Sequence, residues 1–298
     1  MTRQPWGQPP LPEWAISITA TSVHLARVSW GSATPTITVE AGEPLPAGAV
    51  VPSLLAPNLP DVGAVGLVIK RLASQTGGAR RTVALVLPDA VAKVTLVRLE
   101  QVPARESELV DIIRWQLRKS IPFPVEQAVV SIADPGRAAS AGEFLVAAAH
   151  MDIVQQYEQA CAMGDLDVGL VDLESLALLH RASHESGLPE GDWFFVRVDH
   201  HDVTLMLGRG PTVAFHRHRA DEAEGSVSDL IHQTAMFYED RFQGAGFARV
   251  WLVAAPDAAA SADARRDLEA RYGRVLQSLP IRPSAILAGA VAPERGTL

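Results

Sequence analysis

Apolar and polar residues alternate along short stretches near the start of the chain, which is the pattern of strands that bury one face. These stretches are residues 14–19, 22–28 and 36–39. Residues 62–74 then carry apolar side chains at helical spacing, and Gly77 and Gly78 end that pattern. The run 83–87 is apolar throughout, as in a central strand covered on both faces. The pattern predicts three connected strands, a helix and a buried strand, in that order.

The second part of the chain repeats this order of elements. Strand patterns lie at 193–198, 203–207 and 213–216, followed by a helix pattern at 228–242 and a strand pattern at 250–253. Further helices are predicted at 261–272 and 284–291. A repeated order of elements indicates duplicated domains. A loop rich in glycine and proline separates the two parts, so we predict a first half over 14–187 and a second half over 188–298. Residues 1–13 are predicted to form a flexible tail.

An amphipathic helix pattern followed by a proline corner stands out within the first half. The apolar positions that share one face of this helix are Leu109, Ile112, Ile113 and Leu117. The segment Ile121-Pro122-Phe123-Pro124 ends the helix, because each proline forces its predecessor towards extended geometry. The β-branched content of 128–132 then predicts a strand.

Trp115 lies away from the apolar face of this helix, between Arg114 and Arg118. An aromatic ring flanked by arginines on a polar face has the composition of an interface anchor. Packing of Trp115 against a neighbouring subdomain is the alternative, and the sequence favours neither. The two readings differ in whether loss of the ring lowers the melting temperature.

Composition narrows the function further. The 298 residues are 48% hydrophobic and 20% charged, as in soluble globular proteins. The net charge of -8 argues against general binding of nucleic acids, which requires a basic surface. Cys161 is the only cysteine, so neither an intrachain disulfide nor a cysteine-based metal site is expected. Because no secretory signal pattern and no apolar run of about 18 residues occurs, we expect a cytoplasmic protein without direct membrane insertion.

Two other kinds of chemistry are disfavoured. His200, His201 and Asp202 suggest a metal site together with His216 and His218. Adjacent residues on a strand point to opposite faces, however, so a turn at the surface is the better interpretation and no metal is predicted. A hydrolase is not predicted either, because no G-x-S-x-G elbow occurs and the glycine clusters lack a phosphate-loop lysine.

Three parts of the sequence resemble segments of one protein family: 114–117 with 121–124, 171–177, and 287–290. They are similar to segments of the type IV pilus assembly protein PilM family, a branch of the actin-like ATPase superfamily. The resemblance implies an α/β, actin-like (ribonuclease H-like) fold of duplicated domains, with a small inserted α+β subdomain at about 88–150. It also implies a cytoplasmic location, peripheral to the inner membrane through a bitopic, PilN-like partner whose cytoplasmic tail docks in a cleft of the first half. Pilus motor or platform components are further implied partners.

The same resemblance implies ATP and Mg²⁺ between the two halves, but the residues expected there are replaced. The Asp, Gly and Lys of the family's first loop fall on Ser17, Thr19 and His24. The Asp and Gly of the second loop fall on Arg197 and Asp199, and the glycine pair falls on Ala254 and Ala255. Lost carboxylates remove the usual Mg²⁺ anchors, and added side chains fill space that phosphates require. We therefore predict a pseudo-ATPase without a cofactor.

The sequence thus favours a non-catalytic adaptor of a type IV pilus assembly machine. The residues expected to contact the partner are Arg114, Trp115, Arg118, Ile121 and Phe123. The tail is expected to add along an exposed strand edge or to fill a groove near the inserted subdomain. The alternatives are a functional actin-like ATPase or kinase with unorthodox phosphate loops, a GspL-like component of type II secretion, and a divisome-like filament protein. The absence of a terminal amphipathic membrane helix counts against the last of these.

Overall fold

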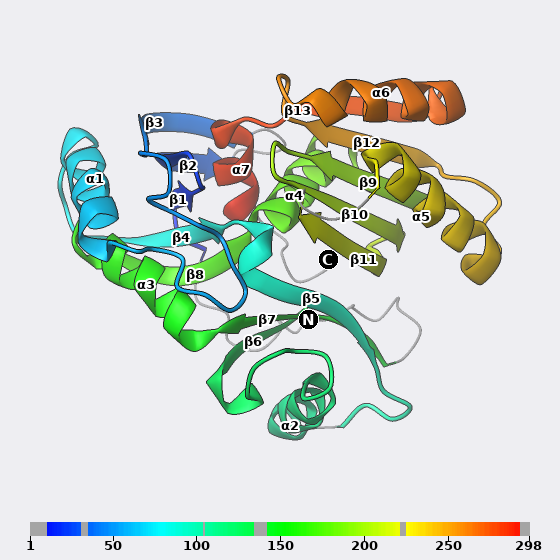
Figure 1. Cartoon of the computed structure of the whole chain (residues 1–298), viewed down its shortest axis with the longest axis horizontal. Coiled ribbons are helices and arrows are strands. Elements are labelled where there is room, and N and C mark those ends of the chain that lie inside the picture. Colours follow the sequence, from blue (N-terminus) through cyan, green and yellow to red (C-terminus); the bar gives the residue numbers. More distant parts are fainter. Residues whose placement is uncertain (1–10, 31–34, 104, 134–141, 221–224, 293–298) are drawn as a thin grey trace.

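The computed structural model describes residues 11–30, 35–103, 105–133, 142–220 and 225–292, and two five-stranded sheets form its framework (Figure 1). The first sheet has the order β3-β2-β1-β4-β8. Its strands are β1 (Trp14–Ile18), β2 (Ser22–Trp30), β3 (Pro35–Pro44), β4 (Arg81–Leu87) and β8 (Leu166–Leu173). β1, β2 and β3 are antiparallel neighbours, whereas β4 and β8 run parallel to β1.

The second sheet repeats this topology with the order β11-β10-β9-β12-β13. Its strands are β9 (Asp192–Val198), β10 (Asp202–Arg209), β11 (Thr212–Ala220), β12 (Arg249–Ala254) and β13 (Leu276–Pro280). Again the first three strands are antiparallel neighbours and the last two run parallel to the first. The duplicated order confirms the predicted actin-like α/β fold.

Helices cover the sheets from outside and fill the space between them (Figure 1). α1 (Val62–Gln75) and α3 (Met151–Ala162) pack on each other beside the first sheet, and α5 (Val227–Phe242) and α6 (Ala259–Tyr272) flank the second. α4 (Glu174–Ser186) and α7 (Pro283–Ala290) lie between the two halves. Gly289 allows α4 and α7 to approach closely, since a Cβ there would lie 1.8 Å from the carbonyl oxygen of Ala177.

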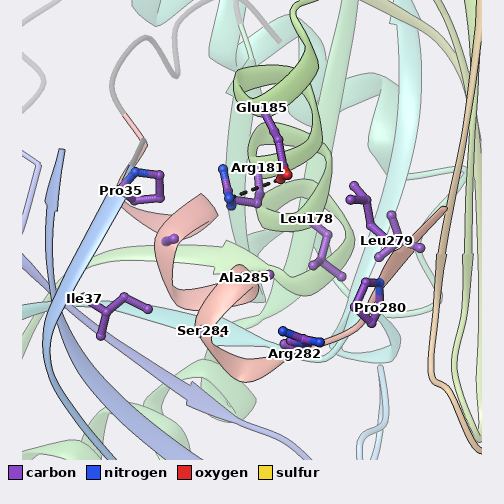
Figure 2. Close-up of a pocket in the computed structure, with 12 residues that line it drawn as sticks. Pro35, Ile37, Leu178, Arg181, Glu185, Leu279, Pro280, Arg282, Ser284 and Ala285 are labelled. Atoms are coloured by element: carbon purple, nitrogen blue, oxygen red, sulfur yellow. Dashed lines mark ion pairs between the residues drawn. The ribbon is translucent and has the colours of Figure 1, made fainter. Parts of the chain in front are cut away.

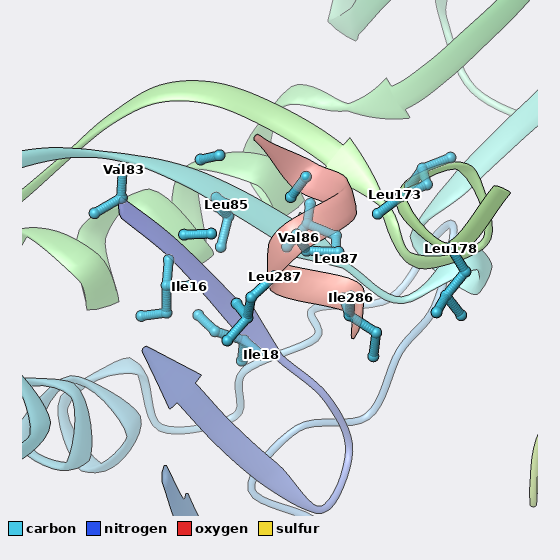
Figure 3. Close-up of a cluster of buried hydrophobic side chains, with 14 of the residues drawn as sticks. Ile16, Ile18, Val83, Leu85, Val86, Leu87, Leu173, Leu178, Ile286 and Leu287 are labelled. Carbon is cyan, nitrogen blue, oxygen red and sulfur yellow. The ribbon is translucent and has the colours of Figure 1, made fainter. Parts of the chain in front are cut away.

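The core of the first half is completed by the last helix of the chain. Ile286 and Leu287 of α7 join Ile16, Ile18 and Leu85 of the first sheet in one buried cluster (Figure 3). Burying side chains of this size contributes about 1.5–3 kcal/mol each. Because α7 follows the second sheet in sequence but packs on the first, the two halves share part of their core.

A third, smaller sheet lies within the segment predicted as an insertion. It contains β5 (Ala92–Arg98), β7 (Glu143–His150) and β6 (Ala128–Ala133), in that order, and all neighbours are antiparallel. Two short 3-10 turns, η1 (Asp89–Val91) and η2 (Val125–Gln127), precede β5 and β6, and α2 (Glu106–Leu117) packs on the sheet. This inserted subdomain has its own core, which includes Val97, Ile113, Leu117, Phe144 and Val146.

One expectation requires correction, and one strand was not predicted. Ile112 does not share the buried face of α2: it is 37% exposed, whereas Ile113 and Leu117 are fully buried. A step of one residue turns a helix by about 100°, and the small sheet covers only a narrow stripe of α2. β13 was not predicted, because its sequence Leu-Gln-Ser-Leu-Pro does not show the apolar composition of a strand. It forms an edge strand, where polar residues and a terminal proline are tolerated.

Candidate functional site

The β1–β2 hairpin carries the first three residues aligned with nucleotide contacts. Ser17 is buried on β1 and faces His24 of β2 across the antiparallel pair. The Thr19 hydroxyl accepts a hydrogen bond from the Ser22 amide at 3.1 Å and lies 3.1 Å from the Ser22 carbonyl oxygen, to which it donates. The Thr19 side chain therefore closes its own turn through these two hydrogen bonds.

Arg197 lies in β9 at the aligned position of the second aspartate and is 1% exposed. Its guanidinium lies 2.9 Å from Glu174 Oε1, 3.0 Å from Asp199 Oδ2 and 3.7 Å from Asp89 Oδ2, and it also pairs with Asp202. Asp199 and Asp202 belong to the same half as Arg197. Asp89 and Glu174 belong to the other half, so these five residues, the Arg197 cluster, join the two halves.

Hydrogen bonds fix the first-half side of the cluster. The Ser175 amide and hydroxyl donate to Asp89 Oδ1 at 3.1 and 2.8 Å, and the Thr204 hydroxyl donates to Asp89 Oδ2 at 2.8 Å. Thr204 also lies 3.1 Å from His218 Nδ1. Ser175 is in α4, whereas Thr204 is in β10 and His218 in β11. Asp89 is thus held by both halves.

Burial and charge determine the protonation of the cluster. Burial raises the pKa of Glu174 to about 7, although Arg197 lowers it. Burial alone would lower the pKa of Arg197, but the neighbouring carboxylates hold it well above its ordinary value. For Asp89, burial opposes ionisation, yet Arg197 and His218 lower its pKa below the usual range. A permanent cation therefore stands among carboxylates at the boundary between the halves.

The position of the family's glycine pair is filled as well. Ala254 and Ala255 are both buried. The Ala255 amide donates to the Val198 carbonyl at 2.9 Å, and the Ala254 carbonyl accepts from the Ile281 amide at 3.0 Å. These backbone groups already have partners within the chain. The seven positions aligned with nucleotide contacts form two groups. One group lies at the ends of β9 and β12 and comprises Arg197, Asp199, Ala254 and Ala255. The other lies around the β1–β2 turn and comprises Ser17, Thr19 and His24.

A second feature lies where the ends of β4 and β8 meet the inserted subdomain. It is a groove of about 110 Å³, which we call the β6/β8 groove. Its lining is Leu87, Val91, Ala92, Val129, Ser131, Ala147, Ala149, Val154, Val171, Asp172, Leu173 and Leu176. Among the described strands, β8 ends the first sheet and β6 ends the small sheet. The groove therefore contains residues of two strands that each lack a neighbour on one side.

The five predicted partner residues divide into internal and exposed ones. Ile121 is 7% exposed and belongs to the core of the inserted subdomain, and the Phe123 ring packs there against His150 with centroids 5.1 Å apart. Arg114 donates to the Val125 and Ala128 carbonyls at 3.1 and 3.4 Å, which anchors the proline corner. None of the five lines the β6/β8 groove.

Trp115 and Arg118 form the exposed part of the predicted partner surface. Trp115 is 62% exposed, and the Lys119 ammonium lies 6.0 Å from its ring centroid. Arg118 pairs with Glu126 at 3.0 Å on the surface. The partner roles of Trp115 and Arg118 stay predictions.

The sequence reasoning missed Asp89 and Glu174, the first-half members of the Arg197 cluster. Each is a single acidic residue after a buried strand, and no local pattern marks it. A signal was present in β9, whose sequence Asp-Trp-Phe-Phe-Val-Arg-Val places an arginine inside a buried strand. A buried arginine requires a carboxylate partner, so acidic residues at neighbouring strand ends were the candidates.

Residues 15–198 match the family model of the type IV pilus assembly protein PilM. The fold is also similar to that of a solved PilM-PilN type IV pilus biogenesis complex, with a TM-score of 0.70 and 19% identity over 96% of this chain and 92% of that chain. A further likeness is to the cytoplasmic domain of EpsL, an inner membrane component of the type II secretion system of Vibrio cholerae. There the TM-score is 0.51 and the identity 9%, over 93% of both chains. At identities this low, the two likenesses show a shared fold and nothing further.

Proposed function

Because the chain belongs to the family of the type IV pilus assembly protein PilM, we propose that it is a non-catalytic cytoplasmic adaptor of a pilus assembly machine. In this proposal it docks the cytoplasmic tail of a bitopic, PilN-like inner-membrane partner, which provides its attachment to the membrane. In the part of the chain that the structure describes, no helix is long and apolar enough to span a bilayer. The solved complex in which a similar fold pairs with PilN supports the choice of partner.

The observation that carries the proposal is the β6/β8 groove. A strand at the end of a sheet presents unpaired backbone N–H and C=O groups, to which an extended peptide can add. β8 alternates between exposed and half-buried residues along most of its length, as expected of such an edge. Val171 on β8 and Val129 on β6 are 38% and 43% exposed beside the groove. A tail with apolar side chains at every second position fits this surface, because alternate residues of a strand point to the same side.

The Arg197 cluster supports the non-catalytic part of the proposal. Magnesium in nucleotide sites is held by carboxylates and phosphate oxygens, whereas here a guanidinium takes the position of one carboxylate. The remaining carboxylates are directed to Arg197, Thr204 and Ser175 rather than left for a metal ion. The cluster thus joins the halves with resident side chains, at the boundary where the family resemblance implies a bound nucleotide.

The Arg197 cluster and the β6/β8 groove are built from neighbouring residues of the same segments. Asp89 lies between the groove residues Leu87 and Val91, and Glu174 directly follows the groove residue Leu173. Contacts of Arg197 with Asp89 and Glu174 therefore fix two segments of the groove wall. We propose that the groove is preformed for this reason, which lowers the cost of ordering it when the tail binds.

Fluorescence anisotropy with a labelled peptide of the partner's cytoplasmic tail tests the proposal. The peptide should bind the intact chain, and Val171→Asp or Val129→Asp should weaken binding at least about ten-fold, because a charge then has to be desolvated. Leu67→Asp is the matched control, since Leu67 is 53% exposed on α1 and does not line the groove. Equal affinity of the wild type and both groove variants would rule out the groove as the docking site.

A further inference from the structure

A second cavity lies between the two halves, apart from the β6/β8 groove (Figure 2). Its volume is about 250 Å³. Figure 2 shows Arg181 and Leu178 on α4, with Pro35 and Ile37 of β3 on one side and Leu279 of β13 on the other. None of the residues aligned with nucleotide contacts lines this cavity, and no residue is shared with the groove. The cavity therefore needs an explanation of its own.

Arg181 places an incompletely bonded guanidinium in this cavity. Its Nη2 pairs with Glu185 Oε2 at 3.1 Å, one turn along α4. Its Nη1 is buried and has no hydrogen-bond partner among the described residues. The Arg181 side chain is only 18% exposed. A buried N–H group without a partner is costly, and such groups in folded proteins are usually satisfied by protein, water or a ligand.

A second arginine makes the cavity electropositive. Arg282 is the N-cap residue of α7 and lines the cavity together with Ser284 in the first turn of that helix. Arg181, Arg282 and Glu185 leave one positive formal charge over, so a ligand with one negative charge balances the site. The other walls are apolar and include Leu178, Leu279 and Ile37.

We propose that this cavity binds a small monocarboxylate with a compact apolar body. The carboxylate would accept from the Arg181 guanidinium, and Arg282 would add a second positive charge, an arrangement that suits the planar guanidinium. The apolar body would contact Leu178 and Leu279. The volume corresponds to about eight water molecules and is below the usual range of drug-sized pockets, so a small acid fits and a nucleotide does not.

Isothermal titration and ligand-observed NMR with 4-phenylbutyrate test this assignment, with its neutral amide, 4-phenylbutyramide, as the matched probe. The acid should bind the wild-type chain at least about ten-fold more tightly than the amide, because only the acid forms charge-assisted hydrogen bonds. The acid should also raise the Tm, since it contacts both halves of the folded chain.

Two variants locate the binding. Arg181→Met keeps the apolar stem and should weaken binding of the acid at least about ten-fold while leaving the amide nearly unaffected. Arg80→Met is the control, because Arg80 pairs with Asp167 on the surface and does not line the cavity. The proposal fails if neither probe binds, if the acid and the amide bind equally, if Arg181→Met binds the acid like the wild type, or if Mg-ATP displaces the acid.

Discussion

Arg197 of β9 and Glu174 of α4 form an ion pair at 2.9 Å that crosses the boundary between the two halves, with both side chains buried. The guanidinium of Arg197 belongs to the chain itself, so this connection between the halves requires no bound ligand. This relationship leads to predictions about stability, its pH dependence and nucleotide affinity.

Replacement of Arg197 should strongly destabilise the chain. Arg197→Met leaves Asp89 and Glu174 buried without their cation, and breaking a buried pair in this way typically costs about 3–5 kcal/mol. The free energy of unfolding from urea titration measures the effect. Arg27→Met is the control, because Arg27 and its partner Glu13 are 50% and 67% exposed, and such surface pairs contribute about 0–1 kcal/mol.

A second substitution separates charge from packing in that experiment. If the cost comes from unpaired carboxylates, adding Glu174→Gln to Arg197→Met should restore part of the lost stability. If the double variant is less stable than Arg197→Met alone, the electrostatic explanation is wrong.

Ionisation of Glu174 should lower the stability of the folded chain as the pH rises. Its pKa rises from an ordinary 4.5 to about 7 in the folded chain, mainly through burial. The folded state then binds a proton more tightly than the unfolded state between about pH 4.5 and pH 7, so this contribution to stability is lost as the pH rises through that window. The full effect is on the order of 3 kcal/mol.

A matched comparison isolates this contribution, because His216 acts in the other direction. Burial lowers the pKa of His216 to about 4, which makes stability rise with pH between about 4 and 6.5. The wild type should therefore lose stability relative to Glu174→Gln as the pH rises from 4.5 to 7. Chemical denaturation of both proteins across this range gives the difference, and a constant difference would contradict the assigned pKa.

Trp115 should matter for binding and not for folding. The ring is 62% exposed, so Trp115→Ala should change the free energy of unfolding by no more than about 0.5 kcal/mol. Ile113→Ala on the same helix should cost about 2–5 kcal/mol, because Ile113 is fully buried. If Trp115 contacts the partner, Trp115→Ala also weakens tail binding. A large fall in melting temperature for Trp115→Ala would instead mean that the ring is packed.

Nucleotide binding should be absent or very weak. Calorimetric titration with Mg-ATP is expected to give no saturable heat at micromolar concentrations, since Arg197 and Thr19 stand at the positions where the family resemblance implies a metal-binding aspartate and a glycine beside the phosphates. Micromolar affinity would favour the alternative of an actin-like ATPase with unorthodox phosphate loops.

The duplicated fold was predictable from the sequence, whereas the connection between its halves was not. Alternating strands and the apolar run 83–87 are local patterns that predict strands of the two sheets, whereas the inserted subdomain was predicted from the family resemblance that the proline corner at 121–124 carries. The contacts among Asp89, Glu174 and Arg197 join three separate elements, and no spacing of residues in the sequence indicates that these elements meet in the fold. β13 was missed because an edge strand carries little apolar signal.

Hydrogen–deuterium exchange with and without the partner's cytoplasmic tail tests docking at the β6/β8 groove most directly. If the tail adds as a strand, amides of β8 or β6 should exchange more slowly in the complex, while those of the opposite edge strand β3 should be unchanged. Tail binding that leaves β6 and β8 unprotected, with protection confined to another surface, would contradict the proposed docking site.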